Sequence, residues 1–361
     1  MTPPPDSSLA SAPQRSIFAQ ADGAGGSLPS WAPYGAFVGA LIFCAAIEAA
    51  LGWFTIALML VFGALVAIAA IYAWSRAVEG RRRAKDRAIT MAIATAFGLA
   101  MVPLISLLYE VIKRGAAGIN LDFFTTTSRG VVGGGGAEHA IVGTLIITGC
   151  AAIISVPIGI MAAIYMNEYG RGPLRRALTF FVDVMTGIPS IVAGLFAYAL
   201  FELFLGPGIR LGIMGSLALS VLMIPIVIRT SEEVLKIVPN HLREASYALG
   251  TPKWKTITKV VLPTAFAGLV TGVMLATARI IGETAPLLVT TGVIDSMNTD
   301  PFSGRMQNLA VYAYNEYRSP GVMKQASYDR AWAAALTLIA IVMILNVIAR
   351  LVYRRYKTEI R

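Results

Sequence analysis

The sequence predicts an all-α protein, a polytopic membrane helical bundle of about eight transmembrane helices. Three observations lead to this prediction. Of the 361 residues, 56% are hydrophobic and only 14% are charged, whereas soluble domains carry about 25% charged residues. The mean hydropathy is +0.68. Long apolar runs recur along the chain, and most approach the ~20 residues that a helix needs to cross a bilayer.

The spans follow one another along the chain. Residues 1–33 are rich in Pro, Ser, Ala and Gly and poor in large apolar residues, which predicts a disordered tail. The apolar-run rule then predicts eight spans, of which the first two meet at Gly52 and form a hairpin over 34–74. The seventh is interrupted by Gly282 and Pro286, which predicts a kink. The expected spans are 34–52, 54–74, 88–109, 140–166, 175–203, 211–229, 262–291 and 331–352.

Positively charged residues indicate the orientation of these spans. The segments 75–87, 167–176, 229–260 and 350–361 together hold 20 Lys and Arg residues, and the three loops that alternate with them hold 8. This asymmetry predicts that both termini are cytoplasmic. It also explains most of the formal charge of +10, because the basic residues lie mainly in the loops expected on the cytoplasmic side. We therefore expect a lipid bilayer and no nucleic acid as a partner.

The charged loop over 240–263 contains helix signals that a simple connector does not need. Asn240 is typical of an N-cap, and Gly250 is placed as the residue that ends a helix. Thr251 and Pro252 then start a second helix, as N-cap and first residue. An amphipathic helix on lipid headgroups and a helix docked in a partner's groove both fit this pattern, but only docking needs a fixed stop. One narrow apolar face is predicted from the helical spacing of Leu242, Ala245 and Leu249.

The same loop resembles the EAA loop of ABC importer permeases. That pattern has Glu-Ala-Ala, three residues, Gly, nine residues and Ile-x-Leu-Pro, and this chain departs from it only by Ser246 for the third residue and Val260 for Ile. The resemblance implies a coupling helix at 240–250 that sits in a groove of a separate dimer of ATPase subunits. The contact residues that it implies are Glu244, Ala245, Tyr247, Leu249 and Gly250.

The chain contains no Gly-Lys dipeptide, so it lacks a G-x-x-x-x-G-K-[ST] phosphate loop. We therefore expect this chain to be a transporter subunit rather than an enzyme. It should hold no catalytic residues and no cofactor, with ATP and Mg²⁺ used by the ATPase subunits. The two histidines, His139 and His241, are too few and too far apart to predict a metal site.

Five further segments carry a narrower resemblance: AAIYMNEY (162–169), GIPSIVAGLFAYALF (187–201), IPIVIRTSEEVLKIVP (224–239), ARIIGETAPLL (278–288) and PLLVTTG (286–292). They are similar to the PstA-type permeases of phosphate ABC importers. The resemblance covers about residues 80–361 and implies a permease domain over 75–361 with six spans, to which the 34–74 hairpin is an addition without an assigned role. It also implies a bacterial cytoplasmic (inner) membrane location, phosphate as substrate, a second permease of PstC type and a periplasmic or extracellular phosphate-binding protein.

Charged residues inside apolar runs are candidates for the substrate pathway, because a charge at membrane depth costs ~2.5–3.5 kcal/mol on insertion scales. Arg279 and Glu283 lie four apart on one face of the expected helix. They form either a structural salt bridge or an arginine that meets phosphate, with Glu283 as its resting partner. Arg229, at the cytoplasmic end of its span, either matches a second arginine of the family or anchors the helix at the interface.

Three residues that disturb helices are candidates for gating hinges, with ordinary kinks as the alternative interpretation. They are Gly282, Pro286 and Pro189.

Three other functions stand as alternatives. An ABC permease for another oxyanion or small solute has the same EAA loop. An ion-coupled secondary transporter would contain an internal inverted repeat, and no clear repeat is found in the sequence. A membrane enzyme would need paired intramembrane carboxylates or a nucleophile–base motif, and the sequence contains neither.

Overall fold

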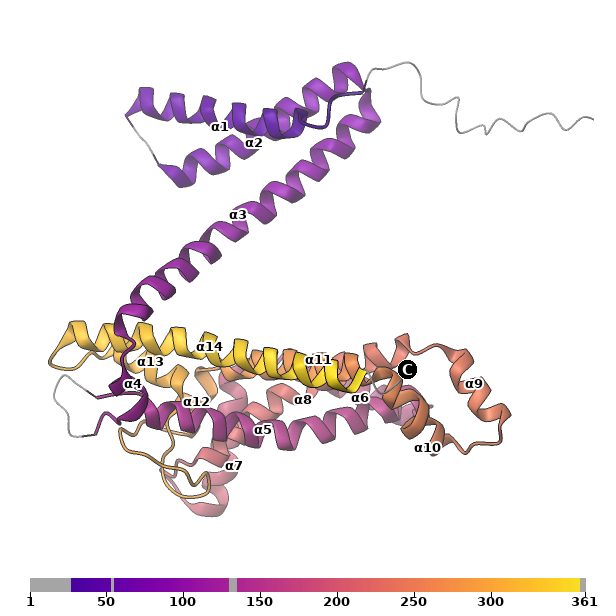
Figure 1. Ribbon diagram of the computed structural model, residues 1–361, viewed down its shortest axis with the longest axis vertical. Coiled ribbons are helices and arrows are strands. Elements are labelled where there is room, and N and C mark those ends of the chain that lie inside the picture. Colours follow the sequence, from indigo (N-terminus) through magenta and orange to yellow (C-terminus); the bar gives the residue numbers. More distant parts are fainter. Residues whose placement is uncertain (1–26, 53–54, 130–134, 358–361) are drawn as a thin grey trace, which may run out of the picture. The chain divides into compact units, whose positions relative to one another are not determined.

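The computed structural model describes residues 27–52, 55–129 and 135–357, and every regular element in these ranges is a helix (Figure 1). Seven of the described helices are long and apolar enough to cross a membrane, and a bent pair of helices raises the number to as many as eight. The predicted all-α bundle of about eight transmembrane helices is therefore confirmed. The predicted tail lies largely outside the described residues, so its disorder stays a prediction.

Two compact units divide the chain between Leu108 and Tyr109. In the first unit, α1 (Ala32–Leu51) and α2 (Ile56–Val78) pack against each other and match the first two expected spans. α3 (Arg81–Gly118) starts in the first unit and ends in the second. The predicted domain boundary at residue 75 stays a prediction, because the third expected span lies on this shared helix.

Glu79 connects three parts of the first unit. It follows α2 directly, and the Arg87 Nε of α3 lies 2.6 Å from its Oε2. The Ser75 hydroxyl and the Leu28 amide donate to the same carboxylate, each at 2.7 Å. Burial raises the pKa of Glu79, but these hydrogen bonds and the arginine charge outweigh burial and lower the pKa to about 2. The ionised carboxylate therefore holds the residues before α1 against the start of α3.

The second unit is built around α8 (Gly212–Ile237), which has the largest buried share of the described spans. It packs against α5 (Glu138–Ile164) and α11 (Leu262–Ile281), and apolar side chains of all three helices form the main core. The other elements of this unit are α4 (Leu121–Thr125), η2 (Tyr165–Tyr169), α6 (Pro173–Thr186), α7 (Ser190–Leu205), α9 (Asn240–Ala248), α10 (Lys253–Thr256), η3 (Ile257–Val261), α12 (Ala285–Thr290), α13 (Leu309–Arg318) and α14 (Lys324–Lys357).

The expected span over 175–203 is not one straight helix. α6 and α7 meet at an angle of 106°. The cause is Pro189, which has an extended backbone with ψ of 136° and disfavours helical geometry in the residue before it. α7 then packs on α12, where Gly194 lies so close that an added Cβ would be 2.6 Å from the Pro286 Cα.

The expected span over 262–291 is also interrupted rather than kinked. α11 ends at Ile281, three non-helical residues follow, and α12 begins at Ala285. At the other end, α10, η3 and α11 form one span from Lys253 to Ile281. The π-helical turn of η3, in which the Leu262 amide donates to the Ile257 carbonyl, directly precedes Pro263, which has no amide hydrogen to donate.

Candidate functional site

The loop between α8 and α11 forms two short helices at one end of the second unit (Figure 1). The predicted caps are each displaced by one residue. Pro239, not Asn240, is the N-cap of α9, and its carbonyl accepts from the Leu242 amide at 3.3 Å. Pro252, not Thr251, caps α10, because its carbonyl already accepts from the Lys255 amide at 2.9 Å.

The end of α9 agrees with the sequence analysis. Gly250 has a φ of +72°, where a side chain would cost roughly 1–2 kcal/mol. Its amide donates to the Tyr247 carbonyl at 2.9 Å, and the Thr251 amide donates to the Ser246 carbonyl at 3.2 Å. These two bonds are the Schellman arrangement, which turns the chain sharply after the helix.

The predicted narrow apolar face of α9 is wrong. Leu242 packs inward on a core cluster, but Ala245 is exposed and Leu249 is 85% exposed. The buried side is fixed instead by Ser246, whose hydroxyl lies 2.8 Å from the buried Thr256 hydroxyl of α10. Leu249 lies beyond the last helical residue, so helical periodicity does not determine its direction.

An exposed surface therefore remains on the outer side of the loop. We call it the loop patch, and it also contains Trp254, an exposed aromatic residue that the sequence analysis did not single out. Large exposed apolar side chains in one place are typical of an interaction site. The loop patch consists of Glu244, Ala245, Tyr247, Leu249 and Trp254.

A buried ion pair anchors this loop to the end of α5, and the sequence analysis missed it. The Arg243 Nη2 lies 2.9 Å from the Glu168 Oε1 of η2, and both side chains are mostly buried. Arg243 also donates to the Leu235 and Val238 carbonyls, at 3.0 and 2.6 Å. From the other helix, the Lys253 ammonium contacts the Glu168 carbonyl. Both halves of the loop are thus attached to one turn of η2.

The intramembrane charges Arg279 and Glu283 form the predicted ion pair through Arg279 Nη1 and Glu283 Oε1. They do not share a helix face, because Glu283 lies in the interruption after Gly282. The Glu283 side chain is 13% exposed and that of Arg279 is 64% exposed. The glutamate side chain is thus mostly buried, whereas the arginine side chain is mostly exposed.

Arg229 is not at the end of its helix. α8 continues through polar residues to Ile237, about 12 Å further along the axis. The Arg229 Nη2 contacts Asp183 of α6, and Nη1 lies 3.4 Å from Glu232, which also accepts Lys236 at 2.8 Å. The positive charges of two basic side chains and the negative charges of two carboxylates balance in this cluster. In the part of the chain that the structure describes, Arg229 and Arg279 have different acidic partners, so their ion pairs are separate.

The three candidate hinges lie in different surroundings. Pro189 directly precedes α7 and is exposed, whereas Pro286 is buried in α12 against Gly194. Gly282 ends α11 with a φ of −91°, and a Cβ added to it would meet no atom within 4 Å, so sterics do not require glycine there. Their role in gating stays a prediction. Among the described residues, no group of three or more His, Cys, Asp and Glu side chains is arranged to hold a metal ion.

Comparison with known proteins places these features in a family. The model of the family described as "binding-protein-dependent transport system inner membrane component" matches residues 155–360. The phosphate transport system permease protein PstA 1 of Mycobacterium tuberculosis (strain ATCC 25618 / H37Rv) is 45% identical over 276 residues, which are 75% of this chain and 88% of that protein. The phosphate transport system permease protein PstA of Yersinia pestis is 40% identical over 290 residues, which are 78% of this chain and 94% of that protein.

A solved structure shares the fold. It is the crystal structure of a bacterial alginate ABC transporter in complex with an alginate pentasaccharide-bound periplasmic protein. The match has a TM-score of 0.55 at 14% sequence identity and covers 75% of this chain and 95% of that chain. At this identity the likeness concerns the fold alone.

Proposed function

Because this chain belongs to the family of binding-protein-dependent transport system inner membrane components, and within it to the PstA permeases, we propose that it is a permease subunit of an ATP-driven importer for inorganic phosphate. The observation that carries the proposal is its 40–46% identity to PstA relatives over about three quarters of the chain. The loop between α8 and α11, with its Schellman stop and exposed patch, is the local feature that an importer permease needs.

The proposed assembly contains several other chains. This subunit forms half of the translocation pathway and a second permease of PstC type forms the other half. A dimer of ATPase subunits binds ATP and Mg²⁺ on the cytoplasmic side, and a periplasmic or extracellular phosphate-binding protein delivers the substrate. The complex lies in the bacterial cytoplasmic (inner) membrane, with both termini of this chain in the cytoplasm.

The loop patch is the proposed contact with the ATPase subunits. Its residues lie on α9, on the turn after it and on α10, and these elements are fastened by the Ser246–Thr256 and Arg243–Glu168 contacts. A surface that is held at two points moves together with the elements that hold it. Closure of the ATPase dimer is therefore passed to α5 through η2 and to α11 through η3.

Arg279 is the proposed contact with phosphate inside the membrane. A guanidinium has five N–H donors, and the ion pair with Glu283 engages only one side of it. The Arg279 side chain is 64% exposed, so its other N–H donors are accessible to an anion in the pathway. Bidentate binding of phosphate by arginine is strong because donor and acceptor geometries match. Glu283 balances the charge when phosphate is absent.

The double variant Arg279→Gln, Glu283→Gln separates this role from a structural salt bridge. Single variants are uninformative, since each leaves one uncompensated charge at a cost of several kcal/mol. The double variant leaves none, so it should insert and assemble but fail to transport phosphate. Normal uptake by an assembled double variant would contradict the anion role. The matched control is the exposed i,i+4 pair of α3, Glu110→Gln with Arg114→Gln, which should leave uptake unchanged.

The substrate is tested by uptake in cells that lack this chain. Radiolabelled phosphate, sulfate, molybdate and an amino acid mixture are each supplied at micromolar concentration, with and without a plasmid that restores the chain. We expect only phosphate uptake to depend on the chain. Dependence of another solute, with phosphate unaffected, would assign the chain to an ABC importer for that solute.

A further inference from the structure

Two arginine side chains approach one glycine of the second unit. A Cβ added to Gly292 would lie 2.9 Å from the Arg210 Cδ and 3.1 Å from the Arg305 Cδ. Both side chains therefore pass close to the same point, which they can do because residue 292 has no side chain. Gly292 also has a φ of +73°, which glycine adopts without strain.

This arginine pair, Arg210 and Arg305, lies at the end of α8 that is remote from the loop patch. Arg210 is two residues before the start of α8, and the loop that carries the patch follows the other end. α8 has 26 residues and is about 39 Å long at the helical rise, more than the ~30 Å hydrocarbon core of a bilayer. The pair is therefore external in the proposed orientation.

One of the two guanidiniums is fixed by α12. The Arg210 Nη1 donates to the Leu288 and Val289 carbonyls, at 3.0 and 2.6 Å, near the C-terminal end of this helix. α12 begins two residues after Glu283 and has six residues, about 9 Å at the helical rise. A single short helix thus separates the arginine pair from the ion pair of Arg279 and Glu283.

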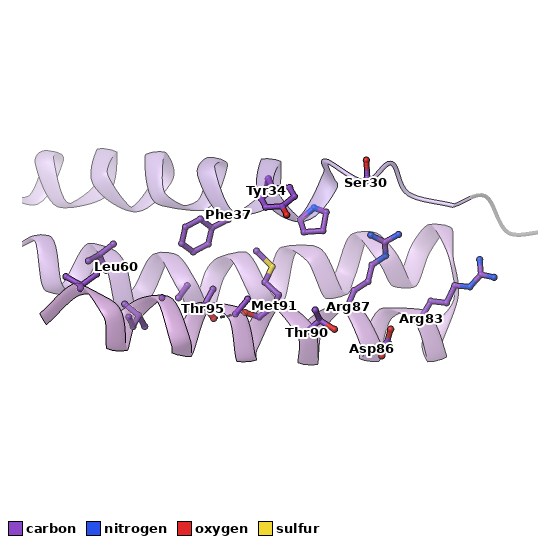
Figure 2. A pocket seen from close by; sticks show the side chains of 16 residues that line it. Ser30, Tyr34, Phe37, Leu60, Arg83, Asp86, Arg87, Thr90, Met91 and Thr95 are labelled. Atoms are coloured by element: carbon purple, nitrogen blue, oxygen red, sulfur yellow. Dashed lines mark hydrogen bonds between the residues drawn. The ribbon is translucent and has the colours of Figure 1, made fainter. Parts of the chain in front are cut away.

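The other guanidinium is exposed and unpaired. The Arg305 side chain forms no hydrogen bond, ion pair or ring contact with the part of the chain that the structure describes. By contrast, Arg87 lines a cleft of the first unit (Figure 2) and donates to Glu79 at 2.7 Å. The Arg305 backbone is nevertheless held in place, because the amide of buried Met306 donates to the Thr291 carbonyl at 3.2 Å. All five N–H donors of a positioned guanidinium are therefore available.

Carboxylates are present nearby in the sequence but do not occupy these donors. Glu202, Asp295 and Asp300 form no ion pair with either arginine among the described residues, and the Asp300 carboxylate accepts a backbone amide at 2.9 Å instead. The charges of these acids offset those of the arginine pair at long range. An anion would therefore be held by directed N–H donors at close range, a geometry that fits an oxyanion.

We propose that the arginine pair is an external entry site for phosphate, at which Arg305 binds the oxyanion with Arg210 beside it before the phosphate reaches Arg279. The inference rests on the proposed function, since it names the outer contact of the same pathway. Arginine suits this role because its planar fork matches two phosphate oxygens.

The direct test is labelling of arginines by phenylglyoxal, followed by peptide mass spectrometry of the full-length chain and its copurifying subunits in nanodiscs. Arg305 should be labelled without anions, and rising inorganic phosphate should slow this labelling at least about tenfold. Exposed Arg318, in the same external segment, is the internal control and should not be protected. Equal protection of both arginines, no protection of Arg305, or no labelling of Arg305 without phosphate would overturn the proposal.

Transport into proteoliposomes separates phosphate binding from docking of the phosphate-binding protein. Arg305→Gln should lower the maximal rate of phosphate uptake about tenfold, because charge-assisted hydrogen bonds are lost. The concentration of phosphate-binding protein that gives half the maximal rate should not change, and Arg318→Gln should match the unaltered chain. An unchanged maximal rate would overturn the proposal, and so would a higher half-maximal concentration, because Arg305 would then contact the binding protein. If phosphate uptake by cells depends on the chain while Arg305 is not protected, the entry site fails and the proposed function stands.

A pair of glycine variants tests the close approach without changing any charge. Gly292→Ala should lower the maximal rate as Arg305→Gln does, because its Cβ displaces both arginines. Gly208→Ala is the matched control, since Gly208 also has a positive φ, of +81°, but a Cβ added to it would meet no atom within 4 Å. Equal losses in the two variants would contradict the role of Gly292, because backbone strain would then account for both.

Discussion

Replacing Arg243 by Met removes the cation that faces a buried carboxylate. The Glu168 side chain is only 5% exposed and that of Arg243 is 12% exposed, so water cannot readily take over the lost interactions. Breaking such a pair costs ~3–5 kcal/mol, and every 1.4 kcal/mol is a factor of ten. Local opening of the loop between α8 and α11 should therefore become about two to four orders of magnitude more frequent.

Hydrogen exchange of the peptides that cover α9 and η2 measures this opening directly. In the Arg243→Met variant, protection of these peptides should fall about 10²–10⁴-fold, with no change in α14. Phosphate uptake should fall in parallel, because a loosened loop no longer transmits the movement of the ATPase subunits. Lys255→Met, at an exposed cation of the same loop, is the matched control and should change neither quantity.

The double variant Arg243→Met, Glu168→Met completes the thermodynamic cycle. It leaves no uncompensated charge, and an apolar pair often replaces a buried ion pair without loss of stability. We expect its protection to exceed that of either single variant by at least about tenfold. Unchanged exchange in Arg243→Met, or normal uptake despite rapid exchange, would refute the reasoning that this pair anchors the coupling loop.

Three further predictions concern other parts of the chain. Gly250→Pro should insert normally but abolish uptake, since proline is restricted to negative φ, and normal transport would contradict the coupling role. Gly194→Ala should lower stability by ~1–3 kcal/mol in thermal unfolding, because its Cβ meets Pro286, whereas Gly149→Ala, with open space, should not. Glu79 has a lowered pKa of about 2, so the stability that it contributes is complete above about pH 4.5 and is lost as the pH falls toward 2. Hydrogen exchange of the peptide that contains Leu28, divided by the exchange of an unfolded reference at the same pH, should accelerate over this interval. A ratio that stays constant would contradict this prediction.

Sequence reasoning succeeded where the signal is local. Apolar length was enough to locate α1, α2, α5 and α8, since a membrane helix satisfies its own backbone and depends little on its neighbours. The stop at Gly250 was equally local, because only glycine adopts its φ without strain. The ion pair of Arg279 and Glu283 was found from two charges in an apolar run.

The remaining features depend on contacts between distant segments. Arg243 and Glu168 are 75 residues apart, and nothing near either of them indicates the other. The outward direction of Ala245 follows from the hydroxyl pair of Ser246 and Thr256, which a helical wheel does not represent. Pro189 predicted a disturbance between α6 and α7, but neither the angle of 106° nor the close approach of Gly194 to Pro286 of α12 could be read from the sequence.

The role of the first unit illustrates the same limit. Residues 34–74 were recognised as a hairpin, but the salt bridge between Glu79, directly after α2, and Arg87 of α3 was not predicted. A basic segment before a span is expected of any membrane protein.

ATP-driven phosphate import is tested most directly by phosphate uptake into proteoliposomes that contain the complex purified through a tag on this chain. The external solution holds radiolabelled phosphate and the phosphate-binding protein, and the lumen holds either ATP with Mg²⁺ or ADP. We predict that an ATPase and a second permease copurify with the chain and that phosphate accumulates only with luminal ATP. Accumulation without ATP, driven by an ion gradient across the membrane, would contradict it and identify a secondary transporter.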